Sequence, residues 1–357
     1  MHEPGGRQRL PARALGALYG LAAGDALGMP TQACSRPDIV SRYGSLLGAF
    51  EPGPPGHPLA AGLPAGTVTD DTEQAVLLAR LVIEGRGDVD PAALADRLLA
   101  WEESMRARGS LDLLGPSTRR ALSAVAAGAG AEDPGRYGST NGAAMRITPV
   151  GIATPSGDRG LLVDRVVAAS KVTHNTGIAL AGAAAVAAAV SAGVDGATVG
   201  DAVRLGAAAA AAAARRGHWA AGADVASRIG WAAGLVTGLG PEQAMDVVYR
   251  LVGSSLATQE SVPAAFAMAA ASPADPWLAC RMAASLGGDC DTIAAMTGAI
   301  CGACHGVAAF PEDARSTVAR VNDLGLEALA AGLLEVRAAA ASRAGGDASR
   351  AEGDAAR

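Results

Sequence analysis

Long alanine-rich stretches constrain the fold of this chain more than any other feature. Residues 181–189 are mostly alanine, and residues 207–214 are alanine throughout. Alanine has the highest helix propensity of all residues, whereas sheets favour β-branched and aromatic side chains. Aromatic residues make up only 3% of the chain. The sequence therefore predicts an all-α protein whose small side chains allow helices to pack closely.

Two glycine- and proline-rich segments, 43–66 and 128–142, interrupt the helical pattern. Long loops of this kind often lie over a functional site, so we expect the first segment to cover one. Apolar periodicity and capping residues predict the helices. Their expected ranges are 15–27, 69 onward, 91–106, 164–171, 176–192, 198–216, 223–237, 241–251, 259–271, 276–286, 292–308 and 311–340, the last with a break near 323–325.

A single helical domain is expected over residues 12–341. No fixed-period repeat divides the chain, and 357 residues are enough to bury a large core. Residues 1–11 are charged and broken by proline and glycine, and residues 342–357 are small and charged. Segments of this composition bury little apolar surface, so both are predicted to be disordered.

Charge and cysteine content exclude several classes of protein. The net charge is −6 and no basic stripe is present, which argues against a groove for a nucleic-acid polyanion. The N-terminal residues lack signal-peptide character, and the apolar run 203–216 is interrupted by arginines, so no membrane span is expected. Five cysteines, an odd number, indicate reduced thiols. A cytoplasmic protein is predicted.

Two short acidic motifs each come directly before a predicted helix. A single residue is enough to cap a helix, whereas neighbouring carboxylates repel each other unless a cation lies between them. Carboxylate and hydroxyl oxygens suit hard cations such as Mg²⁺, Mn²⁺ or Ca²⁺. Capping and metal binding both remain open, and a dinuclear metal site requires the two helix starts to meet. The two motifs are Thr69, Asp70 and Asp71, and Asp289, Asp291 and Thr292.

Two other interpretations of the segment 287–306 are unfavourable. An aspartyl phosphohydrolase places its nucleophile at the end of a β-strand, but residues 277–288 have a helical pattern. The sequence CGACH at 301–305 matches a covalent haem site, which requires an oxidising compartment. Cys301 and Cys304 lie in an expected apolar helix, where cysteine acts as a small apolar residue. We therefore expect no haem.

The polar loop before residue 143 can cradle a phosphate through its backbone N–H groups, or it can be a simple Asn-Gly turn. Arg146 follows in an apolar stretch and needs a partner, either acidic or a phosphate. His174 lies between two helices, and a lone histidine is more often structural than functional. The loop consists of Gly138, Ser139, Thr140, Asn141 and Gly142.

Five motifs, in this order and spacing, resemble the ADP-ribosylglycohydrolase family, which includes dinitrogenase reductase-activating glycohydrolase. The resemblance extends over residues 15–306. It implies an orthogonal helical bundle with two Mg²⁺ or Mn²⁺ ions in a central cleft. The motifs are GALYGLAAGDALGMP (16–30), GTVTDDTEQA (66–75), NGAAMRITPVGI (141–152), THNT (173–176) and GGDCDTIAAMTGAICGA (287–303).

The resemblance also implies roles for the residues named above. The two acidic motifs hold the metals, and Asp70 or Asp71 accepts a proton from the attacking water. The loop 138–142, supported by Met145 and Arg146, faces the diphosphate, and His174 lies near the distal part of the nucleotide. The implied substrate is an ADP-ribosylated protein or a small ADP-ribosyl or ribosyl compound.

One position departs from the family pattern. Where relatives often carry an acid after the GDALG motif, this chain has Gln32, an implied substrate-binding position whose amide cannot titrate. Glu51 is the nearest acid that can substitute. Two alternative functions remain, a hydrolase of smaller nucleosides or ribosyl glycosides, and a non-catalytic ADP-ribose-binding protein. The clustered carboxylates favour an enzyme, because they repel each other without a metal.

Overall fold

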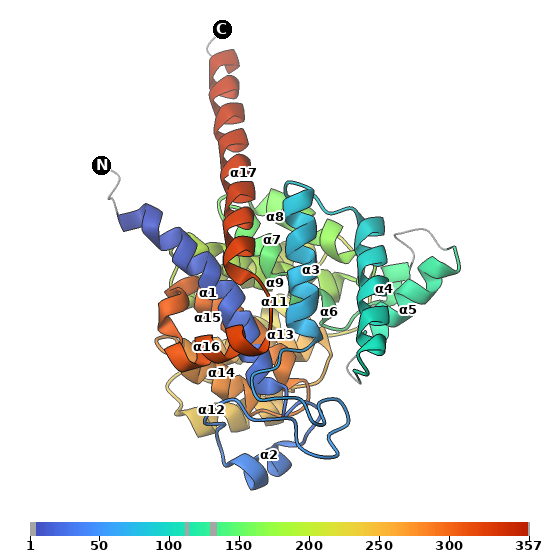
Figure 1. Cartoon of the computed structure of the whole chain (residues 1–357). Coiled ribbons are helices and arrows are strands. Elements are labelled where there is room, and N and C mark those ends of the chain that lie inside the picture. The colour runs from blue at the N-terminus through green and yellow to red at the C-terminus, as the bar shows by residue number, and fades with distance from the viewer. Residues whose placement is uncertain (1–4, 111–113, 129–133, 356–357) are drawn as a thin grey trace.

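The protein is a bundle of α-helices, as its sequence predicts (Figure 1). The computed structural model describes residues 5–110, 114–128 and 134–355. Within these ranges there is no β-strand, and the extended pairing consists of two isolated bridges, Thr140 with Ala257 and Thr176 with His218. Residues 129–133 of the second glycine-rich segment lie outside the described part.

Most helix boundaries lie within a few residues of the predicted ranges, and the exceptions are the helix that begins at Arg159, five residues earlier than predicted, and the outer ends of the first and last helices. Four further helices between residues 36 and 153 have no predicted range. The long C-terminal stretch divides into α16 and α17 next to the predicted break. The elements are α1 (Gly5–Gly28), α2 (Arg36–Tyr43), α3 (Asp70–Glu84), α4 (Pro91–Ala107), α5 (Pro116–Ala126), η1 (Pro134–Tyr137), α6 (Gly142–Arg146), α7 (Thr148–Ala153), α8 (Arg159–Ser170), α9 (Gly177–Val194), α10 (Val199–Ala213), α11 (Val225–Leu235), α12 (Pro241–Val247), η2 (Val248–Val252), α13 (Thr258–Ala271), α14 (Pro276–Ala284), α15 (Cys290–His305), η3 (Val307–Ala309), α16 (Glu312–Val321) and α17 (Leu326–Ala355).

Helices α1 and α15 pack backbone against backbone. Glycines recur every fourth residue of α1, and a Cβ atom added to Gly20 would lie 2.0 Å from the carbonyl oxygen of Gly298. One added to Gly28 would lie 2.2 Å from Cα of Asp291. Because no side chain separates the two backbones, α1 holds the start of α15 in a fixed place.

The alanine-rich helix α9 lies at the centre of the core. All of its residues are buried. By length and composition alone it could cross a membrane, but it lies inside the protein. Its apolar surface is therefore satisfied by neighbouring helices, including α7, α8, α10 and α15.

The two ends of the chain differ from the expectation of disorder. Helix α1 begins at Gly5, so the segment predicted as a disordered lead is largely helical, and α17 continues to Ala355 through the predicted tail. Arginine, glutamine, leucine and alanine favour helix once a turn has formed, and an existing helix extends at low cost. Both helices extend out of the bundle on the same side (Figure 1). Residues 1–4 and 356–357 lie outside the described part.

Candidate active site

The two acidic motifs meet in space, as required for a joint site. Helix α3 begins at Asp70 and α15 begins at Cys290. The hydroxyl of Thr292 donates a hydrogen bond of 3.1 Å to Oδ2 of Asp71, which joins the two helix starts directly. Asp71 is fully buried, and Asp291 is 3% exposed.

Helix capping does not explain these motifs. Thr69 and Asp289 occupy the N-cap positions of α3 and α15, yet neither side chain makes a capping hydrogen bond. The hydroxyl of Thr69 instead points to Asp25, at 2.7 Å. Oδ2 of Asp289 accepts a hydrogen bond from the amide of Asn141. Neither side chain therefore performs the helix capping that is usual at an N-cap position.

Electrostatic repulsion is concentrated on Asp71. Burial raises its pKa well above the usual value, and the charges of Asp70, Asp291, Asp25 and Asp289 raise it further. Burial also raises the pKa of Asp289, although hydrogen bonds from Asn141 and Thr292 oppose the shift. A group of carboxylates that disfavour their own ionisation is expected where a cation supplies the missing charge.

The donor atoms fit a hard cation. Oδ1 of Asp71 is buried and has no hydrogen-bond partner in the described part of the chain, which leaves a strong acceptor unused. Carboxylates and threonine hydroxyls supply only oxygen, the preference of Mg²⁺ and Mn²⁺. Among the described residues, however, no three His, Cys, Asp or Glu side chains lie close enough together to hold an ion. The cluster therefore has the right chemistry but not a closed coordination shell.

Asp25 is the site residue that the sequence analysis missed. Its carboxylate is fully buried in α1 and accepts hydrogen bonds from the backbone N–H and the hydroxyl of both Thr69 and Thr72. Burial raises its pKa to about 6, against the effect of those hydrogen bonds. The sequence did contain one signal for Asp25, which is an acidic residue inside an otherwise apolar segment. Such a charge is expected to be buried, and a buried charge requires partners.

The polar loop and His174 also come together. Nε2 of His174 lies 3.0 Å from the hydroxyl of Thr140. A Cβ atom on Gly142 would lie 2.9 Å from Cε1 of the same ring, so glycine permits the histidine to pack there. The carbonyl of Ser139 accepts a hydrogen bond from the hydroxyl of Thr258, which fixes the loop to α13.

Hydrogen bonds connect this loop to the carboxylates. The amide of Asn141 donates to Asp289 and to Ser261, so this side chain orients a predicted metal ligand. Arg146 is fully buried and donates to Oε1 of Gln74 at 3.2 Å, while the amide of Gln74 donates to Asp70 at 2.9 Å. Arg146 is thus connected to Asp70 through Gln74, and the neighbouring Met145 is buried beside it in α6.

The buried His174 is expected to make the free energy of unfolding depend on pH. Burial lowers its pKa well below 6.5, and the charges of Arg146 and Arg120 lower it further. At low pH the unfolded chain therefore binds a proton on His174 that the folded protein excludes. As a result, the free energy of unfolding falls as pH drops below about 6.5, and His174 contributes at most about 1.4 kcal/mol per pH unit to this fall.

Urea unfolding between pH 7 and 5 should show a smaller loss of stability in His174→Asn than in wild type. A variant of the exposed His218 should match wild type, and an unchanged slope in His174→Asn would contradict the assignment.

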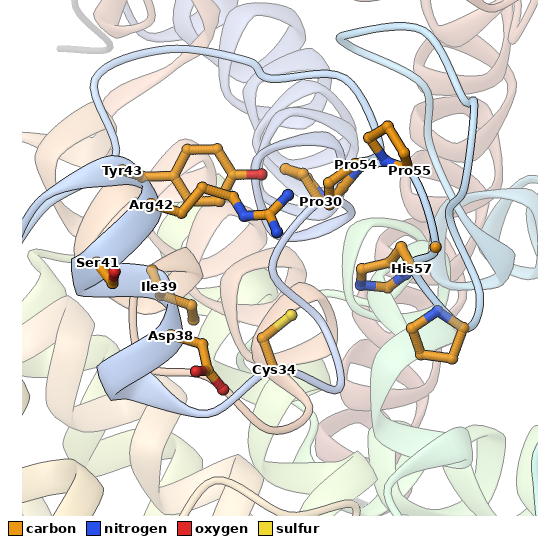
Figure 2. A pocket seen from close by; sticks show the side chains of 12 residues that line it. Pro30, Cys34, Asp38, Ile39, Ser41, Arg42, Tyr43, Pro54, Pro55 and His57 are labelled. Atoms are coloured by element: carbon orange, nitrogen blue, oxygen red, sulfur yellow. The ribbon is translucent and has the colours of Figure 1, made fainter.

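Helix α2 and the proline-rich loop line a cavity of about 360 Å³ (Figure 2), and Gln32 contacts the loop without lining the cavity. Gln32 is 6% exposed, and its Nε2 atom has no hydrogen-bond partner among the described residues. His57, on the loop, donates from Nε2 to the backbone carbonyl of Gln32 at 2.8 Å while its Nδ1 accepts from Ala60. The loop therefore covers this cavity, which the side chains of Cys34, Asp38, Arg42, Tyr43 and His57 line.

The segment 30–34 separates this cavity from the carboxylates. Pro30 and Cys34 line the cavity, while the backbone of residues 33 and 34 makes two hydrogen bonds to Gly288, next to Asp289. Burial raises the pKa of Tyr43, and the charge of the nearby Glu51 adds to the shift.

A family model for ADP-ribosylglycohydrolase matches residues 6–343. The chain belongs to the ADP-ribosylglycohydrolase family. An uncharacterized protein of Escherichia coli K12, YegU, is 36% identical over 326 residues, which are 91% of this chain and 97% of that protein. An uncharacterized protein of Archaeoglobus fulgidus is 33% identical and covers 80% of this chain and 85% of its own length.

Two further comparisons concern named members of the family. The ADP-ribosyl-[dinitrogen reductase] glycohydrolase of Rhodospirillum rubrum is 32% identical over 46% of this chain and 51% of that protein. A solved structure titled an ADP-ribosylglycohydrolase-related protein complex has a TM-score of 0.63 and 26% identity, and it covers 92% of this chain and 99% of its own. These matches confirm the family predicted from the five motifs and the all-α fold.

Proposed function

We propose that this protein is a metal-dependent hydrolase that cleaves the glycosidic bond between ADP-ribose and a protein side chain or another acceptor. Membership of the family supports a glycosyl hydrolase acting on ADP-ribosylated substrates in general. The observation that carries the proposal is the meeting of two carboxylate-bearing helix starts at Asp71, directly connected to the loop 138–142 through Asn141. Thr69, Asp70, Asp71, Asp289, Asp291 and Thr292 are the residues that would hold two Mg²⁺ or Mn²⁺ ions.

Hydrolysis at the anomeric carbon of ribose develops positive charge on the sugar and requires an activated water. A bound divalent cation would neutralise the acidic cluster and lower the pKa of that water. Asp71 is the better proton acceptor of the two candidates, because its buried Oδ1 atom has no hydrogen-bond partner in the described structure, whereas Oδ2 of Asp70 is bound by Gln74. A positioned general base of this kind contributes about 10²–10⁴-fold to a rate.

The loop 138–142 is the proposed binding site for the diphosphate. Two of its residues are glycines, and the backbone approaches other segments closely at both, since a Cβ atom on Gly138 would lie 2.1 Å from the carbonyl oxygen of Thr173. Gly142 also begins α6, but a helix of five residues has too small a dipole to bind a phosphate alone. The N–H groups of Gly138 and Asn141 are bonded to protein carbonyls, so the other N–H groups of the loop would supply the polar contacts together with the Thr140 hydroxyl, which the buried His174 positions.

The structured loop favours ADP-ribose over a smaller riboside, which needs no diphosphate contacts. Hydrogen bonds from Thr258 and Asn141 fix the loop to α13 and to the carboxylates, so the two parts of the site form one connected surface. A non-catalytic binding protein has no use for a repulsive carboxylate cluster. Gln32 replaces an acid of the family pattern, and the buried nitrogen of its amide has no hydrogen-bond partner among the described residues.

The direct test is release of free ADP-ribose from arginine-, serine- and nucleobase-linked substrates. We expect release from one linkage with Mg²⁺ or Mn²⁺, and only background release after the metal is removed with EDTA. Asp291→Asn should be inactive, and the surface variant Asp164→Asn should match wild type. Release that persists in EDTA would contradict metal dependence. ADP-ribose binding without release from any linkage would instead support the binding-protein alternative.

A further inference from the structure

The buried carboxylate of Asp25 performs the capping that helix α3 lacks. An N-cap side chain normally accepts a hydrogen bond from the N–H group two or three residues ahead. Thr69 makes no such bond, and the N–H of Thr72 donates instead to Oδ2 of Asp25, at 3.1 Å. The N–H of Thr69 donates to the same carboxylate at 3.0 Å. Helix α3 is therefore capped by a residue of α1.

The position of Asp25 is itself fixed against α15. Gly24 and Gly28 flank it on α1, and Cβ atoms at these two positions would lie 2.0 Å from the carbonyl oxygen of Ala294 and 2.2 Å from Cα of Asp291. This backbone contact leaves α1 little freedom to slide relative to α15. The hydrogen bonds of Asp25 thus connect the start of α3 to the start of α15 through a rigid pair of helices.

Asp25 also determines the direction of two hydroxyl groups. The Thr69 hydroxyl lies 2.7 Å from Oδ1 of Asp25 and 3.3 Å from Oδ2 of Asp71, so its proton goes to the nearer Asp25, and Thr72 donates to Oδ2 of Asp25 at 2.5 Å. A hydroxyl has one proton and two lone pairs, so a proton committed to Asp25 leaves the lone pairs of Thr69 available on its other side. Thr69 is a proposed metal ligand, whereas Thr72 is not.

We propose that Asp25 is a positioning residue that sets the separation between the Asp70–Asp71 and Asp289–Asp291 halves of the site and orients the Thr69 hydroxyl for a divalent cation. The inference rests on the proposed metal-dependent function. Residues that orient metal ligands typically change metal affinity by about 10–100-fold when replaced. Asp25 differs from the proposed ligands because all of its described contacts are to protein donors.

The test is Mn²⁺ binding to the metal-free protein, measured by titration calorimetry alongside circular dichroism. Asp25→Asn has the same size, but its amide NH₂ faces N–H and O–H donors and cannot accept from all of them. We expect a folded variant with about 10–100-fold weaker Mn²⁺ binding. Asp195→Asn is the control, because the Asp195 carboxylate, 36% exposed, also accepts hydrogen bonds from the N–H and hydroxyl of Ser156 and pairs with Arg337.

Thr72 provides a second, milder pair of variants in case Asp25→Asn does not fold. Thr72→Val removes one donor to Asp25 and should weaken Mn²⁺ binding several-fold, and Thr72→Ser should restore it. Unchanged Mn²⁺ affinity in folded Asp25→Asn, or in Thr72→Val, would overturn the positioning role, as would an equal loss in Asp195→Asn. A wild-type protein that binds no Mn²⁺ would instead contradict the metal-dependent function itself, so the two failures are distinguishable.

Discussion

Replacing Asp71 with asparagine is expected to reduce ADP-ribose release by about 10³-fold, the middle of the range for a lost general base. Asparagine keeps the size of the side chain. It can still accept a hydrogen bond from the hydroxyl of Thr292, which in the wild-type protein donates to Oδ2 of Asp71 at 3.1 Å. It cannot accept a proton from water, and it removes a negative charge from a metal ligand. The loss should therefore appear in kcat, with ADP-ribose affinity reduced much less.

The same variant should be at least as stable as wild type when no metal is present. The pKa of Asp71 is raised by burial and by four neighbouring acids, which means that ionisation of this residue destabilises the fold. A neutral amide removes that penalty and can donate to a neighbouring carboxylate. An unchanged or higher Tm in EDTA, together with lost activity, would separate a catalytic role from a structural one.

Asp164→Asn is the control for this experiment. Asp164 is exposed and pairs with Arg216 at 2.7 Å on the surface, where an ion pair contributes little. Its activity and Tm should match wild type. Asp71→Asn with more than a tenth of wild-type activity would show that Asp71 is not the proton acceptor, and Asp70 would then be the residue to replace.

Much of the fold was predictable because its determinants are local. Alanine content, capping residues and apolar periodicity are properties of short segments, and they identified helices such as α9 and α15 together with the break near residue 323. The short helices α6 and α7 were missed because five or six residues carry too little periodicity. The ends of α1 and α17 were missed because their composition is compatible with both helix and disorder.

The candidate site was predictable in its residues and less so in its connections. The two acidic motifs were identified because paired carboxylates exceed the needs of a cap, and the structure brings them together at Asp71. The contact of Asn141 with Asp289 joins residues 148 positions apart, and no local pattern indicates such a pairing. The partners of Asp25 are distant in sequence in the same way, because its four donors belong to Thr69 and Thr72 at the start of α3. An acid in an apolar segment indicates that partners are needed but not which residues they are.

Replacing Gly28 with alanine is expected to destabilise the protein strongly and to disturb the site at the same time. The added Cβ atom would lie 2.2 Å from Cα and 2.5 Å from N of Asp291, so the backbones of α1 and α15 must separate. Overpacking of this kind costs about 1–3 kcal/mol in the free energy of unfolding, and sometimes more. Urea unfolding in EDTA measures this change.

Gly230→Ala provides a matched control for the substitution itself. Gly230 lies in helix α11, and a Cβ atom there would meet no other atom within 4 Å. Alanine favours helix over glycine, so this variant should be about 0.5–1 kcal/mol more stable than wild type. If Gly28→Ala were as stable as Gly230→Ala, the close contact between α1 and α15 would be wrong.

Gly20→Ala separates the effect on stability from the effect on the site. Its Cβ atom would lie 2.0 Å from the carbonyl oxygen of Gly298, an equally severe clash. Gly298 is seven residues beyond Asp291 on α15, or about 10 Å along the helix axis. Both variants should therefore lose stability, but Gly28→Ala should lose more Mn²⁺ affinity than Gly20→Ala, because only its clash falls on Asp291. Equal losses of Mn²⁺ affinity would show that the site depends on the overall spacing of α1 and α15 and not on local contact at Asp291.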